Sequence, residues 1–199
     1  MNTVVIGDGP LTVEALTAIA RAGARVELSP SARERMKAAR SLVETWVRQG
    51  RAVYGVTTGF GALCDVAIAP EQTRTLQENI LMSHSAGVGD PLPKEVVRAT
   101  MAVRVQDLSK GHAGLRVETL QALVDLLNSD VVPVVPEKGS VGASGDLAPM
   151  AHLALVLIGR GEAFFRGARM GGREALAAAG LAPLHLDALL FTLTPRDRD

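Results

Sequence analysis

Hydrophobic residues recur along most of this chain at intervals of three and four positions, which is the spacing of an amphipathic helix. This periodicity predicts a short helix after Thr12 and longer helices over residues 31–50, 71–84, 93–108, 116–128 and 147–158, with a further short helix over 172–179. In the helix over 116–128, the apolar positions form one face that is expected to be buried, made of Leu120, Leu123, Val124 and Leu127.

Runs with the composition of β-strands are short and few. Residues 3–6 and 25–28 are predicted strands, and residues 163–170 are predicted to form a small hairpin with Gly167 in its turn. Residues 131–136 are expected to be extended, with prolines that limit their pairing. The fold is therefore expected to be mainly α with a few short β-strands.

A capping box over residues 31–34 is expected to begin the second helix.

The segment over 147–158 is apolar apart from Pro149 and His152, and it predicts a buried helix. Pro149 lies near the start, where a helix tolerates proline because its first N–H groups have no partners within the helix. Three glycines precede the helix at three-residue intervals and predict a tight loop: Gly139, Gly142 and Gly145. The loop leads into a helix N-terminus, where free N–H groups and a partial positive charge stabilise negative charge.

Three interpretations apply to Ala143-Ser144-Gly145 within this loop. Ser144 or Asp146 can cap the helix by accepting hydrogen bonds from its first turn. The loop can cradle a phosphate, although neither glycine-rich phosphate motif has this spacing. In the third interpretation, the Gly145 nitrogen attacks the Ala143 carbonyl, and loss of water across Ser144 leaves an electrophilic ring. From spacing alone the cap is favoured. A serine-hydrolase elbow is excluded because Asp146 stands where that motif needs glycine.

The composition of the chain mainly excludes certain partners and cofactors. The 199 residues are 47% hydrophobic and 3% aromatic, and the formal net charge is zero, which argues against nucleic acid or an anionic membrane as a partner. Cys64 is the only cysteine, and no histidine or cysteine pair has metal-ligand spacing, so neither a disulfide nor a metal is expected. A cytoplasmic location is expected because the first ten residues lack signal-peptide features and no apolar run approaches the ~20 residues of a membrane span.

Three segments carry a family resemblance. Residues 139–149, Gly-Ser-Val-Gly-Ala-Ser-Gly-Asp-Leu-Ala-Pro, resemble the signature of the aromatic amino-acid ammonia-lyases. Residues 54–61, Tyr-Gly-Val-Thr-Thr-Gly-Phe-Gly, look like that family's tyrosine loop, and residues 81–89, Leu-Met-Ser-His-Ser-Ala-Gly-Val-Gly, like its substrate-selecting segment. The segments stand in the family's order, and the resemblance extends to about Leu184. It implies the N-terminal portion of the helical, fumarase/aspartase-like fold of this family.

The resemblance also implies roles for single residues. Ala143, Ser144 and Gly145 match the triplet that cyclises into the electrophilic prosthetic group 4-methylidene-imidazol-5-one (MIO). Tyr54 matches the tyrosine that acts in proton transfer; because an ordinary tyrosine pKa is ~10, a role as base requires a positive environment such as the helix end. Ser83 and His84 match the substrate-binding pair, and this pair resembles that of the members that act on histidine.

The implied reaction is the elimination of ammonia from L-histidine to give trans-urocanate, a step of histidine degradation, carried out by a homotetramer. The alternatives are a phenylalanine or tyrosine ammonia-lyase, an aminomutase, and a non-catalytic protein that keeps the fold. Thr57 stands where many histidine-type members have asparagine, but threonine occurs elsewhere in the family. The remaining histidines are interpreted as structural, and His152 is expected to be a hydrogen-bonded core residue.

The end of the chain departs from the family pattern. Members of the family are much longer, so residues 1–186 are expected to be the N-terminal portion that carries the MIO loop, with the central helical bundle and C-terminal part missing. Residues 187–199 lack the family's Asn-Gly-Thr-Gln motif and are interpreted as a non-family tail of a shortened or frame-disrupted product. Because further catalytic groups come from the missing part, this chain alone is expected to be inactive.

Overall fold

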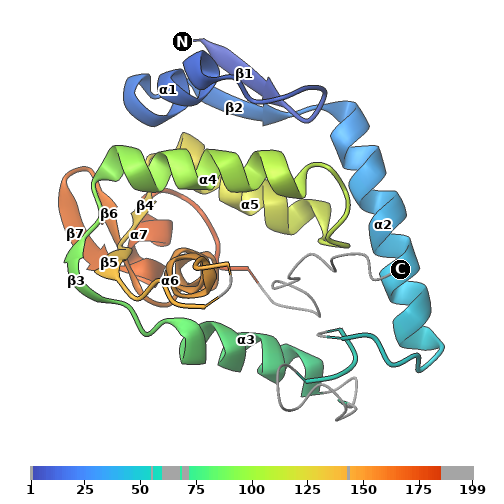
Figure 1. Ribbon diagram of the computed structural model, residues 1–199. Helices are drawn as coiled ribbons and strands as arrows, with labels where there is room; N and C mark the ends of the chain where they lie inside the picture. The colour runs from blue at the N-terminus through green and yellow to red at the C-terminus, as the bar shows by residue number, and fades with distance from the viewer. Residues whose placement is uncertain (1, 55, 60–67, 69–71, 143, 185–199) are drawn as a thin grey trace.

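The structure, a computed structural model, describes residues 2–54, 56–59, 68, 72–142 and 144–184. Its helices in chain order are α1 (Val13–Ala22), α2 (Pro30–Arg48), α3 (Thr73–His84), α4 (Lys94–Leu108), α5 (Val117–Asn128), α6 (Leu147–Leu157) and α7 (Gly172–Ala178). Its strands are β1 (Thr3–Ile6), β2 (Arg25–Leu28), β3 (Val88–Pro91), β4 (Val132–Pro133), β5 (Pro136–Lys138), β6 (Glu162–Phe165) and β7 (Ala168–Gly171). The expectation of a mainly helical chain with short strands is confirmed (Figure 1).

Helices α4, α5 and α6 lie at the centre of the molecule, with the other elements around them (Figure 1). On one side α1 packs against α4, and β2 packs against α5. On the opposite side α3 packs against α6, while α7 and β6 lie against each other at one end. The 19-residue α2 runs along the other end, from the β1–β2 pair toward α3. None of the helices in this described part of the chain is long and apolar enough to cross a membrane.

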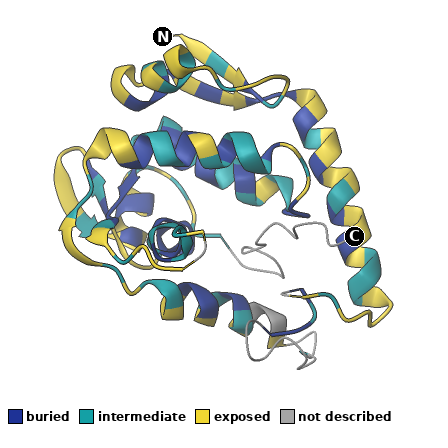
Figure 2. Cartoon of the chain, viewed as in Figure 1, coloured by how far each residue is buried: buried dark blue, intermediate teal, exposed yellow. Residues whose placement is uncertain are grey.

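The main hydrophobic core lies between the three central helices. Their apolar stripes meet there, and Met101, Leu120 and Val156 are fully buried. Helix α6 is buried on nearly all sides, as its continuous apolar sequence predicts, and Figure 2 shows it in the buried and intermediate colours. A second cluster, which includes Ile80 and Leu81, joins α3 to α6. Helix α6 therefore contributes to both clusters and holds the two halves of the molecule together.

The strands form three small sheets. β1 and β2 pair in parallel, β3 and β5 pair antiparallel, and β4, β6 and β7 form an antiparallel sheet with β6 in the middle. The predicted β6–β7 hairpin is confirmed: Arg166 and Gly167 have φ of 50° and 82°, as a type I′ turn requires. Strand β3 was not predicted, because the sequence indicates only the end of a helix at these residues. Its pairing with β5, nearly fifty residues away, leaves no local signal.

The start of α2 corrects the prediction of a capping box over residues 31–34. The helix begins at Pro30, and Ser29 is the N-cap, with its Oγ accepting a hydrogen bond from the Ala32 N–H at 3.1 Å. Proline suits the first helical position because its φ is already helical and its missing N–H needs no partner. The Ser31 hydroxyl instead donates to Asp8.

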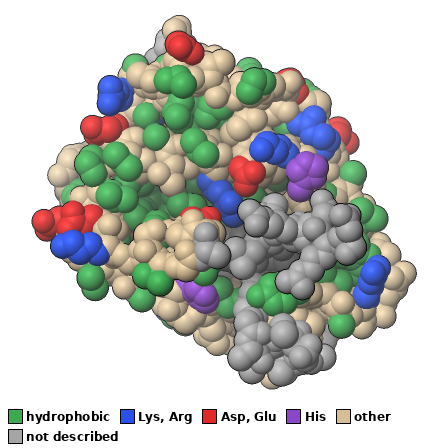
Figure 3. All heavy atoms as spheres, in the orientation of Figure 1, with side chains coloured by type: hydrophobic (Ala, Val, Ile, Leu, Met, Phe, Trp, Pro, Cys, Tyr) green, Lys and Arg blue, Asp and Glu red, His purple; other side chains and the backbone are tan. Residues whose placement is uncertain are grey.

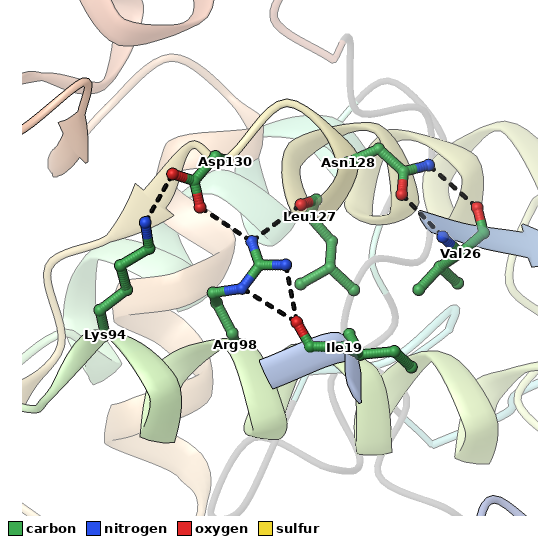
Figure 4. Close-up of polar contacts among 7 residues, drawn as sticks. All are labelled: Ile19, Val26, Lys94, Arg98, Leu127, Asn128 and Asp130. Carbon is green, nitrogen blue, oxygen red and sulfur yellow. Dashed lines mark hydrogen bonds and ion pairs between the residues drawn. The ribbon is translucent and has the colours of Figure 1, made fainter. Parts of the chain in front are cut away.

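Buried polar contacts fasten α4 to its neighbours (Figure 4). The guanidinium of Arg98, which is 3% exposed, donates to the Ile19 carbonyl in α1 at 2.8 Å and to the Leu127 carbonyl in α5 at 3.0 Å. It also donates to the Asp130 carboxylate at 3.0 Å, which Lys94 approaches from the solvent side. One cation therefore satisfies backbone carbonyls near the ends of two helices, where the last C=O groups have no partners within the helix.

Next to this cluster, a side-chain amide holds β2 against α5 (Figure 4). The Asn128 Oδ1 accepts a hydrogen bond from the Val26 N–H at 2.8 Å, and its Nδ2 donates to the Val26 carbonyl at 2.9 Å. The amide thus pairs with one residue of β2 as a neighbouring strand would.

Candidate active site

The loop that contains Ser144 runs from the end of β5 to the start of α6. Its three glycines all have positive φ, as the predicted tight loop requires: 141° at Gly139, 96° at Gly142 and 70° at Gly145. The Ser140 hydroxyl donates to the Gly145 carbonyl, so a hydrogen bond closes the loop across Ser144. Ser144 is exposed, while Ala143 lies outside the described residues.

The loop enters α6 without the side-chain cap that the sequence favours. Asp146 occupies the N-cap position, but its carboxylate makes no hydrogen bond to the first turn, and its φ of −106° and ψ of −7° are not the extended values of a capping residue. The backbone makes the connection instead, through the Met150 N–H and the Asp146 carbonyl at 2.9 Å. The prediction that Asp146 caps the helix is therefore wrong. Its Oδ1 is buried and has no hydrogen-bond partner in the described part of the chain.

Ser83 and His84 form the C-terminal end of α3. The Nδ1 of His84 lies 2.9 Å from the Ile80 carbonyl and 3.1 Å from the Ser83 Oγ. A carbonyl oxygen only accepts hydrogen bonds, so we assign the hydrogen of the neutral ring to Nδ1. The Nε2 is then left as an acceptor. The Ser83 hydroxyl also donates to the Ile80 carbonyl, at 3.1 Å, so both side chains are fixed to the same backbone group.

Two connections bring the end of α3 beside the Ser144 loop. Strand β3, which follows His84, pairs with β5, which precedes the loop, with Val88 opposite Lys138. The His152 Nε2, on α6, accepts a hydrogen bond from the Gly87 N–H at 3.0 Å. The expectation that His152 is hydrogen-bonded is confirmed, but the residue is half-buried rather than part of the core. The structure thus brings the end of α3, which carries Ser83 and His84, and the loop of Ser144 next to each other through the paired strands β3 and β5.

Tyr54 stands on a third segment, after α2. Val56 packs on Val43 of α2, and the Thr57 Oγ1 closes the turn by donating to the Arg51 carbonyl at 2.6 Å. The Tyr54 side chain is 51% exposed. Residues 55, 60 and 61 of the predicted tyrosine loop lie outside the described residues.

A wide hollow of about 790 Å³ lies between α1 and α4 and extends to the start of α6. Figure 3 shows hydrophobic side chains gathered around it. Its lining includes Val96, Val103, Met150 and Asp146, but none of Tyr54, Ser83, His84 or Ser144. Asp146 and Met150 are the lining residues that lie next to the loop of Ser144. The candidate site is therefore identified by the β3–β5 pairing and the His152–Gly87 hydrogen bond and not by this hollow.

The sequence did not indicate the contact between His152 and Gly87. The two residues are 65 positions apart, and each has an ordinary local explanation, as a core histidine and as a helix-ending glycine. The available signal was the pair of glycines at 87 and 139, because glycines at two separate turns allow two backbones to approach closely.

Comparison with known proteins assigns the class. Residues 11–189 match the family described as Aromatic amino acid lyase, so the chain belongs to that family. Among curated relatives, the chain is 55% identical over 188 residues to the histidine ammonia-lyase of Symbiobacterium thermophilum. The match covers 94% of this chain and 37% of that relative, so the chain spans little more than a third of the length of the relatives it matches.

Solved structures agree on the fold. The histidine ammonia-lyase from Trypanosoma cruzi superposes with a TM-score of 0.85 at 37% identity, over 94% of this chain and 36% of that one. The Pantoea agglomerans phenylalanine aminomutase superposes with a TM-score of 0.87 at 32% identity, over the same shares of the two chains. The fold is therefore common to family members that are named for different substrates.

Proposed function

We propose that this chain carries the electrophile-forming loop and the substrate-selecting pair of an ammonia-lyase that converts L-histidine to trans-urocanate and ammonia. The observation that supports this best is the β3–β5 pairing, which brings the segment after Ser83-His84 beside the loop of Ser144. The family assignment and the identity to relatives named histidine ammonia-lyase support the same reaction.

The described residues fit the prosthetic group that the family implies. Positive φ at Gly142, directly before the triplet, and at Gly145, its last residue, gives the backbone a bend that residues with a Cβ rarely adopt. In the proposed cyclisation the Gly145 nitrogen bonds to the Ala143 carbonyl carbon. The carbonyl oxygen then leaves as one water, and the Ser144 hydroxyl leaves as a second. MIO, once formed, supplies an electron-accepting group for a substrate whose ammonium is a poor leaving group.

The other residues have roles in binding and proton transfer. The His84 Nε2, left as an acceptor by the Nδ1 contact to Ile80, receives a hydrogen bond from an N–H of the substrate imidazole. The phenolic oxygen of Tyr54 takes a proton from the substrate Cβ. The N-terminus of α6 supplies partial positive charge near Ser144, which favours anionic groups there.

A phenylalanine or tyrosine lyase, or an aminomutase, is the second candidate, since the aminomutase of Pantoea agglomerans has the same fold. His84 favours histidine over phenylalanine, because an apolar ring leaves the His84 acceptor without a donor. A phenol offers an O–H donor, so tyrosine is the stronger competitor.

The experiment has two parts. Intact-mass spectrometry of the chain and of its Ser144→Ala variant tests cyclisation, which removes two waters, about 36 Da. The chain is then joined to the remaining portion of the Symbiobacterium thermophilum relative, and urocanate formation is followed by ultraviolet absorbance. We expect turnover of L-histidine by the joined protein and none by the 199-residue chain alone or by Ser144→Ala. Turnover of phenylalanine or tyrosine in place of histidine would overturn the proposed substrate.

The cellular context follows from the proposed reaction. We propose a cytoplasmic enzyme of histidine degradation that acts as a homotetramer, in which the other catalytic groups come from the part of the family sequence outside this chain. Size-exclusion chromatography with light scattering on the joined protein tests the tetramer.

A further inference from the structure

His152 lies on the second turn of α6, in the helix that begins directly after the Ser144 loop. Its Nε2 is 3.0 Å from the Gly87 nitrogen, and because the backbone N–H donates, Nε2 must be the unprotonated nitrogen of the ring. Burial lowers the pKa of His152 and so favours the neutral ring that this contact requires.

Three segments meet at this contact without room for a methyl group. A Cβ on Gly87 would lie 3.0 Å from the His152 Nε2 and 3.2 Å from the Lys138 carbonyl oxygen. A Cβ on Gly139 would lie 2.8 Å from the Gly87 Cα. The chain after α3, the start of the triplet loop and α6 are therefore in direct contact at Gly87, and a shift of one requires a shift of the others.

Hydrogen bonds fix the short stretch of backbone between Gly87 and the Ser83-His84 pair. Between them, the Ser85 N–H donates to the Leu81 carbonyl at 3.1 Å, and the Ala86 N–H donates to the His84 carbonyl at 2.9 Å. On the other side of the contact, Gly139 is followed by the loop that the Ser140–Gly145 hydrogen bond closes. The position of Gly87 therefore determines where the end of α3 lies relative to the Ser144 loop.

We propose that His152 is a positioning residue that, by accepting the Gly87 N–H, sets the Ser83-His84 pair relative to the Ser144 loop. The catalytic meaning of that placement rests on the proposed function, but the hydrogen bond and its effect on the two segments do not. A histidine suits this role because its ring holds the acceptor rigidly with two side-chain torsions.

The test is nuclear magnetic resonance on the full 199-residue chain labelled with nitrogen-15. We expect a scalar coupling through the hydrogen bond between the Gly87 amide nitrogen and the His152 Nε2. Hydrogen exchange at the Gly87 amide should accelerate at least tenfold in His152→Leu, which lacks an acceptor. It should stay within threefold of wild type in His152→Gln, whose amide oxygen can accept. His112→Leu, at an exposed histidine, is the matched control and should change neither measurement.

The positioning role has its own readout. In His152→Leu, the amide resonances of Ser83, His84 and Gly145 should all move, and in His152→Gln they should return toward wild-type positions. Movement confined to Gly87 and α6 would overturn the role, and an absent coupling in the folded wild-type chain would overturn the hydrogen bond. If His152→Leu does not fold, the wild-type coupling and the His152→Gln spectrum still decide.

In the joined protein described above, His152→Leu should raise the KM for L-histidine by at least tenfold, with recovery in His152→Gln. If wild type turns over no histidine while the coupling and resonance shifts are present, the proposed function fails and the positioning role stands. If wild type is active and His152→Leu leaves KM unchanged, the positioning role fails alone.

Discussion

Arg98 extends from α4 with its guanidinium between the ends of α1 and α5 (Figure 4). Its donors meet the Ile19 and Leu127 carbonyls and the Asp130 carboxylate, while its own side chain is almost fully buried. A buried charge is expensive unless it is paired and hydrogen-bonded, and here the guanidinium is both. Asp130 has a positive φ of 58°, so the geometry of this cluster is built into the turn after α5.

Replacing Arg98 by methionine tests how much of the stability depends on this cluster. The substitution keeps most of the apolar stem but removes the Arg98 donors from the Ile19 and Leu127 carbonyls and its charge from Asp130, so the free energy of unfolding should fall by about 3 kcal/mol. Urea denaturation followed by circular dichroism gives the value. The control is Lys37→Met, which removes an exposed pair with Glu34 and should cost less than about 0.5 kcal/mol. Equal effects of the two substitutions would contradict the argument.

At the residue scale, the candidate site was predictable where its chemistry is local. Ser144 and Gly145 were placed by their motif, and the structure puts them in a tight loop before a buried helix, as expected. The partner of His152 was not predictable, because a hydrogen bond between residues 87 and 152 depends on the packing of α3 against α6. Asp146 was misjudged because a residue of capping type in the capping position does not ensure the extended backbone that a cap needs.

At the scale of elements, the longer helices were predictable because they carry apolar stripes or, in α6, a continuous apolar run. Their bounds shift by a few residues, and α2 begins at Pro30 because Ser29 provides the cap that was assigned to Ser31. The strand β3 was missed for a different reason, since its four residues form a strand only by pairing with β5. Short strands made by distant pairing are decided by tertiary contacts, and sequence patterns carry little of that information.

The two serines at the start of α2, the N-cap Ser29 and Ser31 in the first turn, provide a direct test of the cap. Ser29→Ala removes the acceptor for the Ala32 N–H at a fully buried position, and it should lower the free energy of unfolding by about 1 kcal/mol. Ser31→Ala removes exposed contacts to Asp8 and should cost no more than about 0.5 kcal/mol. Thermal or urea denaturation measures both. The opposite order would restore the capping box over residues 31–34.

The β6–β7 hairpin carries an ion pair with a defined pH dependence. The Arg169 guanidinium, hydrogen-bonded to Glu162 at 3.1 Å, holds the pKa of that carboxyl below its ordinary value of 4.5. A carboxyl with a lowered pKa in the folded state adds stability that is fully present above 4.5 and is lost as the pH falls through the folded-state pKa. Because both side chains are about half exposed, the effect on stability is small.

Carbon-13 titration of the Glu162 carboxyl checks this directly. The midpoint should lie below 4.5 in wild type and should rise in Arg169→Gln, which removes the charge. The protection of the β6 and β7 amides, measured as exchange corrected for the intrinsic rate at each pH, should decrease slightly in wild type as the pH falls, and this pH dependence should flatten in the variant. A midpoint that does not respond to Arg169→Gln would show that the pair is not formed in solution.

At the scale of the whole molecule, the chain exposes an apolar face beside α1 and α4. Val96 is 42% exposed and Val103 is 51% exposed, and both line the hollow of about 790 Å³. Contiguous apolar surfaces of this kind are typical of surfaces that another element covers. The chain matches little more than a third of the length of its relatives, and the remainder of the family fold is the natural candidate for covering this face.

The isolated chain should therefore associate with itself through this face as its concentration rises. Sedimentation velocity over a concentration series should show a larger average mass for wild type than for Val103→Lys, which places a charge in the hollow. Val5→Lys, at an exposed position on β1 that does not line the hollow, is the matched control and should behave as wild type. Identical behaviour of Val103→Lys and wild type would place the contact elsewhere.

The side-chain amide of Asn128 protects the edge of β2 from pairing with a strand of another chain. A two-stranded sheet has two edges with unpaired N–H and C=O groups, and a strand of another chain can pair with either edge. On the β2 flank, both backbone groups of Val26 are already taken by one side chain. Addition of a strand on that flank is therefore blocked at Val26, and an incoming chain can pair only beside β1.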